Sequence, residues 1–437
     1  MAAEKDDSIR ANRGLKTTTR NVQTVIESGS LEYDEPKEDI FAWLQVLGAF
    51  VLNLNTWGMM NSYGVFQTFY QLDLLRSHTS SEIAWIGSTQ AFLMSLISII
   101  AGPLFDAGHL SSLLSVGSIL LVLGMMLASI STRYWEVFLS QGVMMGLGFG
   151  CLYLPAPAVV SQYFDARTAL AMGAASTGAA LGGVIYPIAF TQLQPRLGFG
   201  WATRVLGFIL LGTSLLPLLM MRSRAPPRSM RGLDQLVDRT AFRDAPYLLL
   251  NLGLFFGLMG IYVVLYYIEL FALYRTDVSA TLSNWLLVII NTSSLLGRLS
   301  LGHFADRLGS INVQTTVGLA SAVLTFCLLA IRTVPSLVVY SVLYGFAAGA
   351  FMALPAAGVI SLSEDKSKIG TRLGMTLGFV GVGVLVSNPI AGAILGDGQH
   401  QDWVGVISWC GALMIASGLA LVASRVMKIG WGWSRVI

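Results

Sequence analysis

Apolar stretches of about 20 residues recur along most of this 437-residue chain, and this pattern restricts its fold more than any other feature. A helix of about 20 apolar residues is long enough to cross the hydrocarbon core of a bilayer. Hydrophobic residues make up 54% of the chain and charged residues 12%, so polar side chains are too few to cover a water-facing surface. The stretches are too long and too uniformly apolar for barrel strands. We therefore expect an all-α membrane protein.

The positions of the stretches predict twelve transmembrane helices in two sets of six. The first set lies near residues 41–66, 80–101, 110–130, 134–158, 168–190 and 201–221, and the second near 246–272, 281–302, 310–331, 335–360, 371–394 and 404–426. We expect two pseudo-symmetric six-helix bundles, over 41–221 and 246–426. A disordered tail over 1–40, an arginine-rich linker over 222–245 and a tail over 427–437 complete the chain.

Basic residues indicate the orientation of these helices. An even number of spans places both tails and the linker on one side of the membrane, and most of the basic loop residues, such as Arg222, Arg224 and Arg307, lie on that side. By the positive-inside rule that side is the cytoplasm. We expect both termini to be cytoplasmic and the membrane to be the plasma membrane.

The two sets of spans repeat each other in sequence. Residues 102–106, GPLFD, return 200 residues later as 302–306, GHFAD, and residues 154–156, LPA, return at the same spacing as 354–356. Duplicated bundles of this kind place a solute site at their interface and alternate its exposure by rocking. The repeat therefore predicts a transport function.

The repeated loop resembles that of the major facilitator superfamily, in which Gly-x-Leu-x-Asp-Arg-x-Gly follows the second span. The first copy begins at Gly102, reaches Asp106 and lacks the arginine. The second copy begins at Gly302 and keeps both Asp306 and Arg307. In that family the motif latches the bundles together at the cytoplasmic face, and the resemblance implies the same role for these residues.

Within that superfamily, most of the chain after its N-terminal tail resembles fungal monocarboxylate-permease-like proteins. The segments that carry the resemblance are residues 57–66 (WGMMNSYGVF), 161–164 (SQYF) and 182–187 (GGVIYP). The resemblance implies a secondary active carrier of a monocarboxylate or similar small organic anion, driven by solute or proton gradients.

Arg298 is the candidate anion-binding residue, because a guanidinium inside a span is unfavourable unless it faces a cavity or a partner. Its planar fork suits a carboxylate. Residues 298–302 also match the Arg-x-x-x-Gly of monocarboxylate transporters, whose arginine is implicated in substrate binding. The alternative is a structural arginine that pairs with Asp306 or caps helix carbonyls.

Asn61 and Asn291 are candidate pocket residues, and Asn61 aligns with a lysine implicated in the animal transporters. Hydrogen bonding between helices is the alternative for both. Tyr262 and Tyr266, one helical turn apart in the seventh span, can line a cavity and stack on a ring, with ordinary packing or an interfacial aromatic belt as the alternative.

Glu269 is the best candidate for a proton carrier. Asn61 and Ser294 stand where the animal transporters have ionisable residues, so proton coupling would need another group. The alternative for Glu269, as for other acids near span ends, is a solvated interfacial side chain. Four glycines in the fifth span, Gly173, Gly178, Gly182 and Gly183, are interpreted as a helix-packing stripe.

Other classes of function have no support in the sequence. There is no Walker loop, no zinc-protease motif and no nucleophile elbow, so neither ATP hydrolysis nor an enzyme is predicted. No metal site, cofactor or nucleic-acid partner is expected, and we expect a monomer whose partners are the lipid bilayer, an organic anion and, if transport is proton-coupled, protons. The first alternative is an exporter of a fungal secondary metabolite. The second, of another class, is a membrane sensor that does not transport.

Overall fold

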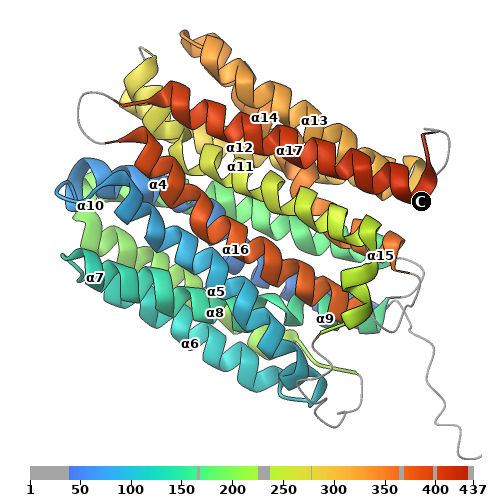
Figure 1. Ribbon diagram of the computed structural model, residues 1–437. Coiled ribbons are helices and arrows are strands. Elements are labelled where there is room, and N and C mark those ends of the chain that lie inside the picture. The colour runs from blue at the N-terminus through green and yellow to red at the C-terminus, as the bar shows by residue number, and fades with distance from the viewer. Residues whose placement is uncertain are drawn as a thin grey trace, which may run out of the picture.

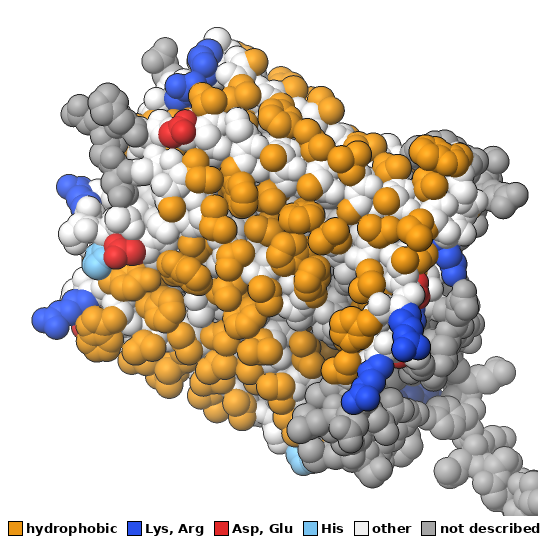
Figure 2. All heavy atoms as spheres, in the orientation of Figure 1, with side chains coloured by type: hydrophobic (Ala, Val, Ile, Leu, Met, Phe, Trp, Pro, Cys, Tyr) orange, Lys and Arg blue, Asp and Glu red, His pale blue; other side chains and the backbone are white. Residues whose placement is uncertain are grey.

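The computed structural model describes residues 39–164, 168–224, 237–276, 278–363, 369–396 and 401–431, which form a bundle of long helices (Figure 1). Apolar side chains cover the middle of the visible face and charged side chains gather at its two ends (Figure 2). A face of this kind matches a bilayer with water on both sides. We call the end where α2 begins and α17 finishes the terminal end, and the opposite end the distal end.

Among the first four spans, the first and the fourth are assembled from several helical pieces. The first comprises α2 (Ile40–Asn53), η1 (Leu54–Gly58), α3 (Met59–Asn61), α4 (Tyr63–Phe69) and η2 (Tyr70–Leu74). The second and third are α5 (Ser80–Asp106) and α6 (Leu110–Ala128). The fourth comprises α7 (Tyr134–Val137), η3 (Phe138–Met144), α8 (Met145–Tyr153) and α9 (Pro155–Tyr163). The segments η1, η2 and η3 are π-helical, a form that is frequent at functional sites.

The fifth and sixth spans form one helical segment, α10 (Thr168–Met220), that folds back on itself at Gly198. Gly198 has a φ of 78°, which residues with a side chain rarely adopt. Tyr186 before the bend and Thr213 after it both donate hydrogen bonds of 2.9 Å to Asn55 Oδ1. A straight helix would hold these two residues about 40 Å apart, so the chain reverses between them.

The last six spans follow a short 3₁₀ helix, η5 (Arg239–Arg243). They are α11 (Ala245–Arg275), α12 (Ala280–Leu308), α13 (Ser310–Cys327) with η6 (Leu328–Ala330), α14 (Val334–Ala353) with α15 (Pro355–Leu362), α16 (Ile369–Leu395) and α17 (Trp403–Ile429). Ten helical runs of the described residues are long and apolar enough to span a membrane. The shorter apolar stretch Trp285–Ser300 of α12 and the fold-back of α10 complete the predicted twelve-helix architecture.

The repeat in sequence has a counterpart in structure. Pro155 and Pro355 each begin a new helix after a break in the fourth and tenth spans, a position where the missing N–H of proline is tolerated. Gly108 and Gly309, with φ of 87° and 90°, follow α5 and α12. The two halves meet where α5 packs along α16 and α10 packs along α12.

Parts of the expected tails and linker lie outside the described residues. These are residues 1–38, 225–236 and 432–437. In α12, the surroundings of Gly302 and the side chain of Asp306 also lie outside the described part.

Candidate functional site

Arg298 lies on α12 at the interface between the halves. Its guanidinium is within electrostatic range of the Tyr262 hydroxyl on α11 and of the Tyr153 hydroxyl on α8, in the other half. The Nη2 atom lies 3.8 Å from Met352 Sδ, a weak acceptor. Among the described residues no carboxylate pairs with this arginine, and its Nε is buried without a hydrogen-bond partner. A buried guanidinium without a carboxylate partner favours an anionic ligand.

The first half contributes an aromatic pair to the surroundings of Arg298. The Trp57 ring, on π-helical η1, packs edge-on against the Tyr153 ring, with centroids 5.4 Å apart and an interplanar angle of 78°. Trp57, Tyr153 and Arg298 keep part of their surface accessible although protein surrounds them within the bundle. Side chains that line an internal, water-accessible space have this combination of properties.

Sequence reasoning missed Tyr153 and Met352. Both lie just before the Leu-Pro break that recurs at residues 154–155 and 354–355. The repeated break is the signal that could have identified them, because it marks the same bend in the two halves, next to the interface.

The two expected pocket asparagines have different surroundings. Asn61 is 3% exposed and lies one turn after Trp57, and its Oδ1 is buried without a partner among the described residues. Asn291 lies two turns before Arg298, and its Nδ2 donates to Leu287 O at 2.9 Å. The Asn291 amide also lies against Gly183 of α10, where an added Cβ would come within 2.5 Å of Oδ1. Asn291 therefore takes part in the packing of α10 on α12.

Tyr262 and Tyr266 lie along one face of α11, as expected, with ring centroids 6.3 Å apart. Both hydroxyls are buried and have no partner in the described part of the chain. Tyr262 faces Arg298, whereas Tyr266 packs against Tyr63 of the first span with centroids 4.8 Å apart. The pair therefore runs from the candidate site toward the distal end.

Contacts between the halves close the distal side of this site. The Tyr267 hydroxyl of α11 lies 3.4 Å from Ser80 O on α5 and 3.3 Å from Asn388 O on α16. Ser81 Oγ donates to Pro389 O at 2.8 Å. At the terminal end, by contrast, a Cβ added at Gly173 or Gly374 would meet no described atom within 4 Å. The bundle is thus closed at the distal end.

Glu269 belongs to the closed end and is 1% exposed. The solvated alternative considered for this residue is therefore wrong, because α4 packs over α11 at this level and brings Thr68 beside the carboxyl group. Neither carboxyl oxygen has a hydrogen-bond partner among the described residues.

The expected latch residues lie at the terminal end. Gly102 is in the last turns of α5, and Asp106 is the exposed last residue of that helix. Arg307 is exposed in the last turn of α12. The latch function of these residues stays a prediction, because the surroundings of Gly302 and the side chain of Asp306 are not described.

Asn55 and Gly182, two further interior residues, have roles in helix packing. Asn55 accepts the two hydrogen bonds from α10 and donates to Ser214 Oγ at 3.2 Å, so it ties three spans together. A Cβ at Gly182 would lie 2.8 Å from Gly58 Cα, so this part of the glycine stripe permits close helix packing.

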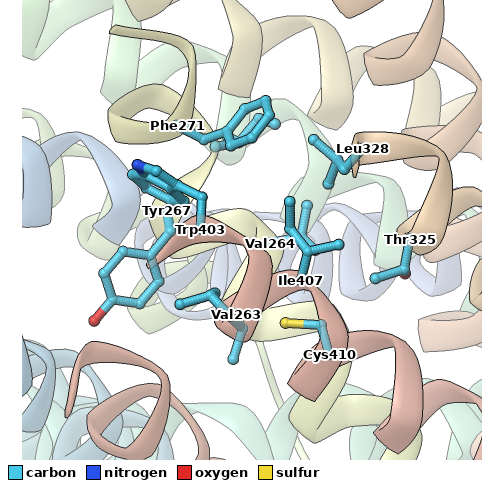
Figure 3. A pocket seen from close by; sticks show the side chains of 11 residues that line it. Val263, Val264, Tyr267, Phe271, Thr325, Leu328, Trp403, Ile407 and Cys410 are labelled. Atoms are coloured by element: carbon cyan, nitrogen blue, oxygen red, sulfur yellow. The ribbon is translucent and has the colours of Figure 1, made fainter. Parts of the chain in front are cut away.

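A small apolar pocket lies within the second half (Figure 3). It lies between α11, α13 and α17, and its walls include Val263, Phe271, Thr325, Ile407 and Cys410. Arg298 and its aromatic neighbours do not line it, and the pocket exposes no polar surface. It is therefore separate from the candidate solute site.

Comparisons with known proteins agree with this fold. Residues 42–333 match the family model described as Major Facilitator Superfamily. The chain is 41% identical over 382 residues to the MFS-type transporter dbaD of Emericella nidulans, covering 87% of this chain and 85% of that protein. It is 34% identical over 388 residues to the aspyridones efflux protein apdF of the same organism, covering 89% and 78%. It is 32% identical over 434 residues to the fujikurins efflux protein of Gibberella fujikuroi, covering 97% and 92%.

These relatives correct one expectation. Two of the three are named efflux proteins, and none of the three is named a monocarboxylate permease, so the finer resemblance to that family is not supported. The superfamily itself is confirmed over most of the chain. This protein belongs to the major facilitator superfamily, and it is a multi-pass membrane transporter rather than an enzyme.

Proposed function

We propose that this protein is a secondary active exporter of an amphipathic, acidic fungal secondary metabolite, and that Arg298 binds the acidic group. The observation that carries the proposal is the Arg298 guanidinium at the interface of the halves, for which the described residues supply no carboxylate partner. A buried cation without a counter-charge gains most from a ligand that supplies one.

The aromatic surroundings support a ligand larger than a short monocarboxylate. Tyr153 of one half lies within electrostatic range of the guanidinium and packs against Trp57, and these two partly accessible rings present aromatic surface beside it. Ring surfaces of this kind bind flat, apolar groups by stacking. An acidic group at Arg298 and a ring system against these side chains describe an amphipathic organic anion.

The closed distal end supports access from the terminal end, which the distribution of basic residues assigns to the cytoplasm. In this proposal both termini and the linker between the bundles over 41–221 and 246–426 are cytoplasmic, and the protein lies in the plasma membrane. The efflux names of two relatives favour movement from the cytoplasm outward. Rocking of the two halves would then expose the site alternately, with the residues of the two loop motifs as the latch.

Uptake of a short monocarboxylate is the second candidate function, because Arg298 suits any carboxylate. It is less favoured, since a short carboxylate would make little use of the accessible aromatic surface of Trp57 and Tyr153.

Transport in reconstituted vesicles tests the proposal. Efflux and uptake of labelled aromatic carboxylic acids, of their methyl esters and of short monocarboxylates would be compared for wild type, Arg298→Gln and Arg298→Lys. A charge-assisted hydrogen bond is worth about 1.5–3 kcal/mol, so Arg298→Gln should weaken the apparent affinity for the acids by roughly 10- to 150-fold. The lysine variant, which keeps charge but not the fork, should lie between.

One control variant and two contradicting outcomes make the result specific. Arg332→Gln, in the loop after η6 and outside the candidate site, should transport like wild type. Equal transport of acids by wild type and Arg298→Gln would contradict the anion-binding role of Arg298. If only short monocarboxylates were transported, the second candidate function would replace the proposed export of a metabolite.

A further inference from the structure

Glu269 is a buried acid that the candidate solute site does not use. It lies on α11, it is 1% exposed, and both carboxyl oxygens lack a hydrogen-bond partner among the described residues. A charged carboxylate without partners is very unfavourable away from water, whereas a neutral carboxyl group is tolerated there. The closed distal end therefore suits the protonated form of this residue.

The position of Glu269 connects it to the contacts that close the distal end. It is two residues beyond Tyr267, whose hydroxyl reaches Ser80 O on α5 and Asn388 O on α16. Thr68 of α4 lies beside the carboxyl group, and its hydroxyl is also buried without a partner. Ser283 of α12 donates to the backbone carbonyl of Glu269 at 2.9 Å. The side chain is thus enclosed between helices of both halves.

Among the described side chains of the surrounding elements, no charged group compensates the carboxyl group. On η2, Asp73 is exposed and paired with a neighbouring arginine at 3.7 Å. Glu82 at the start of α5 is exposed and bonded to the Thr79 backbone, and Asp402 caps α17. Arg275 lies in the last turn of α11, six residues on. Thr68 lies beside the carboxyl group, and burial disfavours its charged form.

We propose that Glu269 is a proton switch for the distal gate, the set of contacts formed by Tyr63, Tyr266, Tyr267, Ser81 and Pro389. Closing the gate buries Glu269 with a proton taken from the distal solution, and opening it lets water reach the carboxyl group, which then releases that proton to the same side. The proposal rests on the proposed alternating-access transport. It adds that low pH on the distal side favours the closed gate.

The gate can be followed without any solute. Arg76 and Val404 are exposed, lie at the distal end and belong to different halves. After replacement of the native Cys151, Cys327 and Cys410, spin labels at Arg76→Cys and Val404→Cys would report the distance between the halves by pulsed electron resonance in nanodiscs from about pH 5 to pH 9. The wild-type protein should show a short distance at low pH and a growing population of longer distances as the pH rises.

Matched variants identify the responsible residue. Glu269→Gln, which cannot lose a proton, should keep the short distance throughout, so the population shift with pH disappears. Glu269→Asp should restore a pH-dependent shift. Glu82→Gln removes an exposed acid at the same end and retains its capping bond, so it should behave as wild type.

Thr68→Val provides a second variant should Glu269→Gln fold poorly. Replacing the neighbouring hydroxyl by a methyl group makes the surroundings more apolar and disfavours the charged form further, so the midpoint of gate opening should move to higher pH. A wild-type response retained in Glu269→Gln, or an unchanged midpoint in Thr68→Val, would overturn the proposed switch. Failure of the vesicles to export any acidic metabolite would instead remove the proposed function and leave the gate measurement valid.

Discussion

Tyr266 on α11 packs against Tyr63 on α4, with ring centroids 4.8 Å apart, between the candidate solute site and the distal end. The two rings come from different halves of the protein, so the halves cannot separate at this end without breaking the contact. An aromatic pair contributes about 0.5–1.5 kcal/mol beyond the apolar area it buries. A gate held by a few contacts of this size can open and close during transport.

Truncating one ring should therefore open the gate. Tyr266→Ala should raise the open population by about 2- to 10-fold, the range that 0.5–1.5 kcal/mol allows. The measurement is the rate at which a membrane-impermeant thiol reagent labels Ser88→Cys, a buried position that accepts a hydrogen bond from Asn388 across the halves.

The matched control keeps the ring. The Tyr266 hydroxyl has no partner among the described residues, so Tyr266→Phe should label at nearly the wild-type rate. Equal labelling of the alanine variant and wild type would show that the ring contact does not hold the gate.

Gly183→Ala should impair transport through the packing of α10 on α12. The added methyl group would lie 2.5 Å from Asn291 Oδ1 and 2.6 Å from its Cγ, so the amide must rotate or the helices must separate. Gly212→Ala on the same segment α10 should be neutral or slightly stabilising, because no atom lies within 4 Å of its Cβ and alanine favours helix. Transport rate and thermal stability in detergent check both variants. A Gly183→Ala protein as active as Gly212→Ala would contradict the packing argument.

Asn55→Ala should destabilise the first half. It leaves the hydroxyls of Tyr186, Thr213 and Ser214 without their shared partner. Hydrogen bonds between membrane helices contribute about 0.6 to 1.7 kcal/mol each, so the melting temperature in detergent should fall by several degrees. Asn53→Ala is the control, since Asn53 Nδ2 bonds only to Ala49 O of its own helix. Similar melting temperatures for the two variants would show that the network contributes little.

Arg372→Gln should release the described end of the linker from α16. The guanidinium donates to Asp238 at 3.2 Å and to Asp244 at 2.8 Å, and it lies 5.1 Å from the centre of the Tyr247 ring. Without it the 3₁₀ helix η5 should detach more often, so trypsin should cleave after Arg243 several-fold faster.

Salt and a second arginine provide the controls for this prediction. The Arg372–Asp244 ion pair is partly exposed, so high salt should also speed cleavage of the wild-type protein. Arg307→Gln removes an exposed arginine at the same end and should leave the cleavage rate unchanged. A linker of Arg372→Gln that is cleaved no faster than wild type would show that the ion pairs do not anchor it.

Some parts of the site could be predicted from sequence because the bilayer makes certain residues conspicuous. Arg298 stands out since a charge within an apolar stretch is expensive and therefore rare. The asparagines of the first span do not stand out from one another in this way. Both polar atoms of the Asn55 side chain are hydrogen-bonded to other helices, whereas Asn61 Oδ1 has no partner among the described residues. This difference arises from the packing of α10 against η1.

The sequence by itself determined the helical membrane fold, the number of spans and the repeat of the halves, because hydrocarbon thickness and backbone hydrogen bonding leave an apolar chain few alternatives. The tertiary structure decided which distant side chains meet. Tyr153 and Tyr262 lie within electrostatic range of Arg298 from two other helices, and Trp57 packs against Tyr153. Glu269, expected near a solvated span end, is enclosed because α4 packs over α11. Such contacts depend on the relative rotation and approach of whole helices, which side-chain packing sets and which the periodicity of a single span does not encode.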